Sequence, residues 1–365
     1  MHYKLLTPGP LTTTDSVKKS MLKDWCTWDD EYKTLVEDIR SKLLEINNLS
    51  NKKHTVTLLQ GSGTYGVEST IISSVGENDH LLVLKNGAYG ERIHEIATIA
   101  KKNVTALAFD ETSIINSEVL DNYLSENKQI THVAFVHCET TTGILNPLEE
   151  LCKVVKQHQK VLIVDAMSSL GGIPIDIDAL EIDFIISSSN KCLQGVPGFS
   201  FIISVIESIK KCKGNSTSLS LDLYDQWVNM ENDPGKWRFT SPTHVVRAFY
   251  QAILELIQEG GIASRYARYV KNQKVLVEGM QSIGFNCCIA IDIQSPIITT
   301  FLFPDSTSFT FKSLYDYLKL YGFVIYPGKL SNLNVFRIGN IGDINANDIE
   351  LLIMILKNYK INYLN

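Results

Sequence analysis

The sequence has no excess of basic residues: it contains 34 Lys and Arg against 40 Asp and Glu, a formal net charge of -6. A protein that binds a nucleic-acid backbone needs clustered Lys and Arg to neutralise the phosphates. We therefore expect no nucleic acid and no other polyanionic surface as a partner.

Cysteine and histidine patterns that hold metals are also missing. The seven cysteines are odd in number and show no CxxC spacing, which predicts free thiols in a reducing compartment and not a disulfide framework or a zinc site. His94 and Glu95 begin like the helix of a zinc protease, but Thr98 stands where the second histidine is needed. We expect no bound metal.

Long apolar runs are absent as well. No stretch approaches the length that spans a bilayer, and the N-terminus has neither a basic segment nor an apolar segment of the kind found in signal peptides. These absences predict a cytoplasmic protein without a membrane partner.

What remains is the composition of an ordinary globular protein, with 44% hydrophobic and 20% charged residues in 365. Apolar runs of strand length alternate with segments of helical spacing, which predicts an α/β fold with a mainly parallel sheet and helices on both faces. The expected strands are 55–59, 81–85, 103–109, 132–138, 161–166, 182–186 and 199–205. The expected helices include 16–21, 32–46, 67–75, a segment ending at Ile99, 119–124, 147–158 and 245–259.

The chain is long enough for two domains, because single cores stop growing at roughly 250 to 300 residues. We expect an extended N-terminal segment over 1–15, a large cofactor-binding domain over 16–260 and a small C-terminal α+β domain over 261–365. Two prolines and a glycine exclude a helix in the first segment, and Gly260-Gly261 interrupts the helical pattern before the last. The small domain is expected to hold helices over 264–282, 311–321 and 346–359 and strands over 297–303 and 335–338.

Lys191 is the residue around which the rest is arranged. It follows the strand of 182–186 and precedes a GVPG turn, so its amine lies at the carboxyl end of a strand, where open α/β sheets bind ligands. A desolvated lysine loses basicity and can form a Schiff base with a carbonyl. A lysine after a strand is also commonly an ordinary surface residue. Only the other candidate residues in the sequence distinguish a Schiff-base lysine from a surface lysine.

Asp165 ends the apolar strand VLIVD and lies 26 residues before Lys191, enough for one crossover to a neighbouring strand. A carboxylate there needs a partner, because burying an isolated charge is costly. The partner could be a pyridinium N–H or, alternatively, a backbone or serine donor.

Between a strand and a helix stands GSGTYG, in which Gly61, Gly63 and Gly66 satisfy the dinucleotide fingerprint. The next strand ends in Lys85-Asn86 and not in the acid that would bind a ribose. The more general interpretation is a phosphate site at a helix N-terminus, with hydroxyls from Ser62 and Thr64; a plain tight turn is the alternative.

Two further strand ends carry candidate residues. Tyr89 and Arg92 follow the strand of 81–85, where the tyrosine either stacks on a planar ligand or serves only in packing. The strand of 132–138 leads into Glu139-Thr140-Thr141-Thr142-Gly143, a hydroxyl-rich corner. A lysine, an acid, a phosphate site and an aromatic lid together are the parts of a pyridoxal phosphate enzyme.

The motifs resemble, in order and over nearly the whole chain, those of the fold-type I, class V aminotransferases, and within them most closely the 2-aminoethylphosphonate:pyruvate aminotransferase family. The most specific are SSSNKCLQGVPGF (187–199) and KWRFTSPTHVV (236–246), beside LLTPGPLTT (5–13) and HCETTTGILNP (137–147). The resemblance implies a transfer of the amino group of 2-aminoethylphosphonate to pyruvate, giving phosphonoacetaldehyde and L-alanine in phosphonate catabolism.

The resemblance also implies roles for matching positions. Lys191 would hold pyridoxal 5'-phosphate and act as the general base, Asp165 would pair with the pyridine nitrogen, and Tyr89 would stack on the ring. Thr140 would bond the ring hydroxyl, with Thr141 as the alternative. The phosphate would be held by Ser62, Gly63, Thr64 and Asn190, joined by Thr240 of the partner subunit in a homodimer with shared active sites. Arg337 would bind the substrate anion, and Arg92 either assists it or braces the loop.

Other functions are open to test. A serine or alanine:glyoxylate aminotransferase would share fold and cofactor. A cysteine desulfurase would need a reactive loop cysteine, whereas Cys287-Cys288 lie in a run that reads as buried, and it usually shows histidine where Asn190 stands. A nicotinamide dehydrogenase rests on GSGTYG alone. A catalytically inactive binding protein is disfavoured by the presence of both Lys191 and Asp165.

Overall fold

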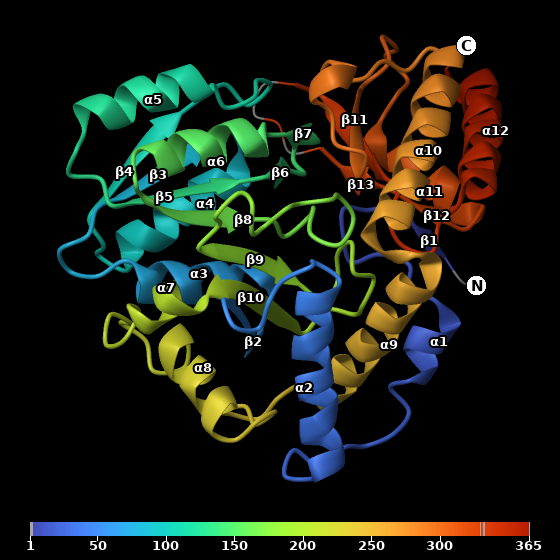
Figure 1. The fold of residues 1–365 in the computed structure, drawn as a ribbon. Coiled ribbons are helices and arrows are strands. Elements are labelled where there is room, and N and C mark those ends of the chain that lie inside the picture. The colour runs from blue at the N-terminus through green and yellow to red at the C-terminus, as the bar shows by residue number, and fades with distance from the viewer. Residues whose placement is uncertain (1–2, 329, 331–332, 365) are drawn as a thin grey trace.

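A computed structural model describes residues 3–328, 330 and 333–364. Its large sheet has the strand order β2-β10-β9-β8-β5-β3-β4, in which β10 runs antiparallel to both β2 and β9 and the other neighbouring pairs are parallel (Figure 1). The strands are β2 (His54–Gln60), β3 (Leu81–Lys85), β4 (Val104–Ala108), β5 (His132–Val136), β8 (Val161–Asp165), β9 (Phe184–Ser188) and β10 (Phe199–Val205). The expected mainly parallel α/β sheet is confirmed.

Helices cover both faces of this sheet, because its strands are apolar on both sides. Leu82 and Leu84 of β3 lie in one hydrophobic cluster, and the alternate residues Leu81 and Val83 lie in another. The first cluster includes residues of α2 (Asp30–Glu45), α5 (Ser117–Glu126), α6 (Leu148–Gln157) and α9 (Thr243–Glu259). The second includes residues of α3 (Gly63–Ser74), α4 (Ala88–Ile99), α7 (Ile206–Lys210) and α8 (Leu223–Asn232).

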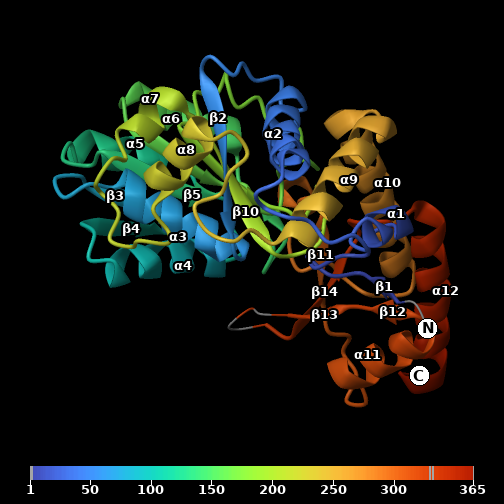
Figure 2. The same ribbon diagram turned by 90° about the horizontal axis from the view of Figure 1, so that it is seen from below.

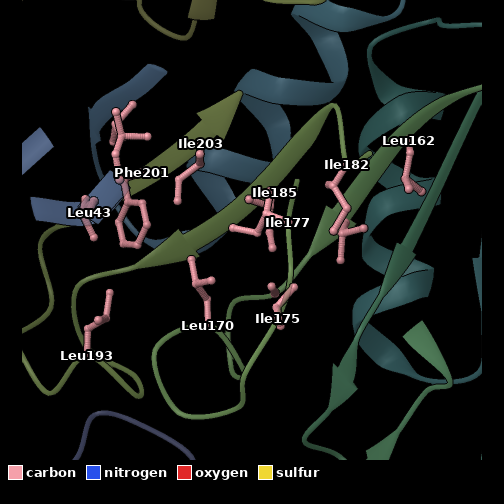
Figure 3. Close-up of a cluster of buried hydrophobic side chains, with 14 of the residues drawn as sticks. Leu43, Leu162, Leu170, Ile175, Ile177, Ile182, Ile185, Leu193, Phe201 and Ile203 are labelled. Atoms are coloured by element: carbon pink, nitrogen blue, oxygen red, sulfur yellow. The ribbon is translucent and has the colours of Figure 1, made fainter. Parts of the chain in front are cut away.

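The first cluster continues beneath the loop after β8. Leu170, Ile175 and Ile177 of this loop lie close to Ile185 of β9, and Figure 3 shows Leu193 on the segment that follows Lys191 pointing into the same region. The crossover between β8 and β9 is therefore part of the core, and it holds the ends of the two strands in fixed positions.

A second sheet, of order β11-β14-β13, forms from the C-terminal part of the chain and lies beside the large one (Figure 2). Its strands are β11 (Ile298–Leu302), β13 (Tyr326–Pro327) and β14 (Val335–Gly339). Packed with it are α10 (Gly261–Ser282), the short helix η1 (Ile291–Ile293), α11 (Phe311–Leu320) and α12 (Ala346–Tyr363).

The N-terminal segment joins this C-terminal group. β1 (Lys4–Leu5) pairs in parallel with β12 (Phe323–Val324), and Leu6 lies in the same hydrophobic cluster as Leu276 of α10. The chain then passes through α1 (Asp15–Lys19), which contacts α9. The domain division at 1–15, 16–260 and 261–365 remains a prediction, and its outermost residues 1, 2 and 365 lie outside the described residues.

Helix ends follow the sequence signals with one difference. Gly260, at a φ of 101°, ends α9 in the left-handed conformation expected of glycine. However, α10 begins at Gly261 itself, so the break is a sharp corner between two helices and not a loop. The sequence analysis also missed α8 and the hairpin of β6 (Cys138–Glu139) and β7 (Ile144–Leu145).

No helix in the described part of the chain is long and apolar enough to cross a membrane. Among the same residues, no group of three or more His, Cys, Asp or Glu is arranged to hold a metal ion.

Candidate active site

A cavity of about 470 Å³ lies where α3 begins and where β5, β8 and β9 end. This is the carboxyl edge of the parallel strands, where ligands of open α/β sheets bind. Its walls are formed by Gly61, Ser62, Gly63, Thr64, Val67, Tyr89, Arg92, Ile93, Val136, Cys138, Asp165, Met167, Ser168, Ser188, Asn190, Lys191, Pro197 and Gly198. Eight of the eleven residues proposed for the site from sequence line it.

Lys191 stands half-buried in the cavity wall, just after β9. Its Nζ donates a hydrogen bond to the carbonyl oxygen of Pro8 at 2.7 Å. Burial lowers the pKa of this lysine, and the nearby carboxyl of Asp165 opposes the shift. The consequence is an amine that gives up its proton more readily than a surface lysine and can act as a nucleophile.

Close packing around Lys191 requires a glycine in the N-terminal segment. Gly9 has a φ of 110°, and a Cβ on it would lie 2.6 Å from Cδ of Lys191. This segment was interpreted from sequence only as an extended lead-in, although its TPGP motif places two prolines around the glycine that makes the contact.

Asp165 ends β8 and is 7% exposed. Burial raises the pKa of its carboxyl to about 6, and the backbone N–H of Met167, which donates to Oδ1 at 2.9 Å, opposes this rise. At neutral pH the carboxylate is therefore charged, and it faces the same cavity as Lys191, as expected from one crossover between neighbouring strands.

The start of α3 is open toward the cavity. Ser62 is its N-cap residue but makes no capping hydrogen bond with its side chain, in contrast to Asp29 of α2 and Asn116 of α5. Free N–H groups and the helix dipole at such an end bind anions. Gly63 packs closely on Met167, because a Cβ there would lie 2.3 Å from its Sδ.

Tyr89 and Arg92 come from the first turns of α4 and line the cavity. The Arg92 guanidinium lies 5.1 Å from the centre of the Tyr89 ring, a cation–π distance, and Nη1 lies 3.5 Å from Oγ1 of Thr64. These contacts connect the α4 side of the cavity with the α3 side.

Thr140 is fully buried behind the cavity and is not among the described residues that line it. Its hydroxyl donates to the Tyr89 hydroxyl at 3.3 Å. Thr141 lies behind it as well, with its hydroxyl 3.4 Å from Oε2 of Glu139. Of the two threonines, Thr140 therefore has the contact with a cavity residue.

Arg337 of β14 is 1% exposed, is not among the described residues that line the cavity, and lies next to Thr140 behind its wall. Its Nη1 donates to the Thr140 carbonyl at 2.7 Å and its Nε to the Pro327 carbonyl at 2.9 Å. Burial lowers the pKa of this guanidinium, which the nearby Tyr89 and Tyr326 oppose. The arginine stands directly behind the cavity wall, with two of its nitrogens already engaged.

Thr240 is not brought to this cavity by its own chain. It is exposed and lines a separate hollow of about 380 Å³ with Tyr32, Trp237 and Phe239. A contribution to the active site from a second subunit remains a prediction.

Sequence reasoning missed Glu139, a carboxylate with no exposed surface just behind Tyr89. Burial raises its pKa to about 7, and backbone N–H groups of Gly90 and Tyr89 oppose this rise. The signal was visible as an acid directly after an apolar strand, the same pattern that singled out Asp165.

Comparisons with known proteins show which sequences this chain is similar to. The family described as Aminotransferase class-V matches residues 21–328. A protein of Bacteroides fragilis named 2-aminoethylphosphonate--pyruvate transaminase is 57% identical over 356 residues, which cover 97% of this chain and 98% of the relative. A protein of the same name from Bacillus cereus is 56% identical over 352 residues, covering 96% of each chain.

Solved structures share the fold. The ureidoglycine-glyoxylate aminotransferase of Bacillus subtilis matches with a TM-score of 0.90 at 21% identity, covering 100% of this chain and 94% of that one. The alanine--glyoxylate aminotransferase of Nostoc sp. matches with a TM-score of 0.89 at 26% identity, covering 98% and 95%.

Proposed function

The chain belongs to the class V aminotransferase family, and on that premise we propose that it transfers the amino group of 2-aminoethylphosphonate to pyruvate, giving phosphonoacetaldehyde and L-alanine. The observation that carries the proposal is the 57% identity, over 97% of the chain, to a relative named for this reaction. At the site, Lys191 and Asp165 face one cavity, as such a transfer needs.

Pyridoxal 5'-phosphate fits the residues that form the cavity. Lys191 supplies an amine whose pKa burial lowers, and Asp165 supplies a carboxylate that is charged at neutral pH. The uncapped start of α3 suits a phosphate, where Gly63 brings the backbone close and Ser62, Thr64 and Asn190 add polar groups. Tyr89 also lines the cavity with its ring available for stacking, and Thr140 contacts its hydroxyl.

When bound, the cofactor supplies an electron sink that stabilises the carbanion formed next to the substrate nitrogen. The chain supplies the proton transfers. Lys191, once its amine is released, takes a proton from the substrate carbon as a general base, and a lowered pKa makes the neutral form available for this. Asp165 holds a negative charge in place, which keeps a proton on a nitrogen placed beside it.

The substrate anions need a cation that accepts both a phosphonate and a carboxylate. A guanidinium binds either through paired N–H donors. We assign this role to Arg337, whose remaining donors are not engaged by Pro327 or Thr140, with Arg92 in the cavity wall as the second cation.

A serine or alanine:glyoxylate aminotransferase is the second candidate, because the Nostoc enzyme has the same fold. Its 26% identity is far below the 57% of the 2-aminoethylphosphonate relative, so the first function is favoured. A shared fold alone does not decide the substrate.

The test is a single-turnover spectrum without any keto acid. Protein loaded with pyridoxal phosphate is mixed with 2-aminoethylphosphonate and, separately, with L-serine. We expect only the phosphonate to remove the visible absorption of the lysine-bound cofactor, and pyruvate to restore it. Lys191→Ala lacks the lysine that gives this absorption, so its conversion is followed by the amount of pyridoxamine phosphate formed, and it should be slower by about two to four orders of magnitude, as expected for loss of a general base. Conversion by serine alone would contradict the substrate assignment.

The homodimer and the cytoplasmic location belong to the same proposal. Thr240 and Phe239 are exposed on the chain, next to the hollow that Trp237 lines, and a second copy covering this surface would bring Thr240 toward its neighbour's phosphate site. The cysteines of the described chain are free thiols, which fits a reducing compartment.

A further inference from the structure

Glu139 is a buried carboxylate that the proposed reaction does not use. It has no exposed surface, and it follows β5 by three residues, at the edge of the sheet where the cavity lies. Isolated buried carboxylates are costly, so each one needs hydrogen-bond donors that compensate for the lost water. The hydrogen-bond donors around Glu139 show which element its carboxylate stabilises.

Two of those donors are N–H groups in the first turn of α4, and a further one is the Thr141 hydroxyl, 3.4 Å from Oε2. Oε1 of Glu139 accepts from the backbone N–H of Tyr89 at 3.1 Å and from that of Gly90 at 2.9 Å. An acid at a helix N-terminus satisfies N–H groups that lack partners in the helix and interacts favourably with its dipole. Glu139 therefore fixes the backbone of the residue whose ring lines the cavity.

The backbone leaves room for this carboxylate. A Cβ on Gly87, the N-cap residue of α4, would lie 2.6 Å from Cδ of Glu139. The φ of Gly87 is 175°, an extended conformation open to any residue, so the close contact and not the backbone angle explains why a glycine suits the position.

The next residue in the chain holds the other end of Tyr89. The Thr140 hydroxyl contacts the Tyr89 hydroxyl at 3.3 Å, and the Thr140 carbonyl accepts from Arg337 at 2.7 Å. Two consecutive residues thus bind the main chain of Tyr89, its phenol and the arginine behind it.

Arg92 depends on the same arrangement. It lies on the first turn of α4 and packs over the Tyr89 ring at 5.1 Å. A shift of Tyr89 would therefore displace this cation from the cavity wall together with the ring.

We propose that Glu139 is a positioning residue that holds Tyr89 and Arg92 in place at the cofactor cavity through its hydrogen bonds to the start of α4. The proposal rests on the proposed function, because it takes the cavity to be the pyridoxal phosphate site. It adds a residue that touches neither cofactor nor substrate and acts through Tyr89.

The experiment compares Glu139→Ala with Glu139→Gln. The glutamine keeps an oxygen that can accept from both N–H groups, whereas the alanine leaves two buried donors without a partner. The apparent Kd for pyridoxal phosphate is measured by titration of cofactor-free protein, and visible circular dichroism reports the orientation of the bound ring. We expect Glu139→Ala to raise the Kd about tenfold or more and to alter the dichroism, and Glu139→Gln to stay within about threefold of the wild type.

Glu37→Ala is the matched control. Oε1 of Glu37 accepts from the backbone N–H of Gly235 at 2.7 Å and from Nη1 of Arg40 at 2.7 Å, so it too satisfies a backbone N–H, at a place that does not line the cavity. This variant should lose thermal stability but keep the Kd and the dichroism of the wild type. It separates a general loss of stability from a loss of ring positioning.

Gly87→Ala tests the same contact without changing Glu139 and serves if Glu139→Ala does not fold. Its methyl group displaces the carboxylate, so the Kd and the dichroism should change in the same direction. Wild-type Kd and dichroism in Gly87→Ala, or in a folded Glu139→Ala, would overturn the proposal.

These two readouts need no substrate. If the wild type binds the cofactor but fails the half-reaction with 2-aminoethylphosphonate, only the substrate assignment falls. A wild type that binds no pyridoxal phosphate would overturn both proposals.

Discussion

Lys191 and Asp165 face the same cavity, and burial shifts their pKa values in opposite directions. Both shifts have one cause, since a desolvated site disfavours the charged form of an amine and of an acid alike. The amine gains nucleophilic character from this. The acid, with a pKa of about 6, is still mostly ionised at neutral pH and keeps the charge that its proposed role needs.

Asp165 makes the stability of the cofactor-free protein depend on pH. Its pKa rises from 3.8 to about 6 on folding, although Lys191 and Arg92 oppose the rise. The folded chain therefore binds this proton more tightly than the unfolded chain, so stability falls as pH rises from about 4 to about 6. Two pKa units correspond to at most about 3 kcal/mol.

Asp165→Asn should remove this dependence. In urea unfolding without cofactor, we expect the variant to match the wild type near pH 4 and to be more stable by about 1 to 3 kcal/mol at pH 7. A variant that is less stable than the wild type at pH 7 would contradict the buried, destabilising charge. The same substitution should abolish most turnover, so stability and activity should change in opposite directions.

Among the described helices whose N-cap residue is Ser, Thr, Asp or Asn, α3 differs from the others in making no capping hydrogen bond with that side chain. Asn116 caps α5 by accepting from the N–H of Val119 at 3.0 Å, whereas the Ser62 side chain makes no such bond in α3. A serine at an N-cap position that does not cap is available for a ligand. The absence of the bond thus distinguishes the proposed phosphate site at the start of α3 from the capped start of α5.

A pair of alanine variants tests this difference. Asn116→Ala should cost about 1 kcal/mol of folding stability and leave cofactor affinity unchanged. Ser62→Ala should leave the stability of the cofactor-free protein within about 0.5 kcal/mol of the wild type and raise the Kd for pyridoxal phosphate severalfold. Urea unfolding and cofactor titration give both values, and a stability loss in Ser62→Ala equal to that in Asn116→Ala would show an ordinary cap.

Most strands of the large sheet could be predicted because they are short apolar runs that are buried on both faces, as in β8 and β9, whereas the edge strand β4 is only partly buried. α8 could not, because its residues alternate between acids, amides and aromatics, and only Leu223, Gln226 and Met230 of it are buried. The hairpin of β6 and β7 could not be predicted for a different reason, because strands of two residues are too short to show an alternation of apolar and polar residues.

At the scale of the molecule, residues distant in the sequence were harder to place than residues at strand ends. Asp165 and Lys191 could be placed at one edge because parallel strands end together. The position of Arg337 depends on how the C-terminal sheet packs against residue 140, and no local pattern encodes such packing. Thr240 was assigned to a partner subunit by resemblance, which one chain does not test.

The proposed homodimer gives a further prediction. Sedimentation equilibrium should yield twice the 40.9 kDa of one chain. Thr240→Ala should raise the Kd for pyridoxal phosphate severalfold without changing that mass, because one hydrogen bond to the phosphate is lost. Phe239→Ala, next to it, should weaken association instead. A monomer with full affinity for the cofactor would exclude a shared site.

The segment from Leu6 to Pro8 limits how far the two sheets can separate. Leu6 accepts from the N–H of Gly339, the last residue of the strand that carries Arg337, and Pro8 accepts from Lys191. Two residues of extended chain span at most about 7 Å. If the C-terminal sheet moves away from the large sheet by more than this segment can still extend, one of these two hydrogen bonds must break. The proposed catalytic amine of Lys191 and the strand that carries Arg337 are thus joined by one short segment, and the lysine loses its hydrogen-bond acceptor when the sheet moves away.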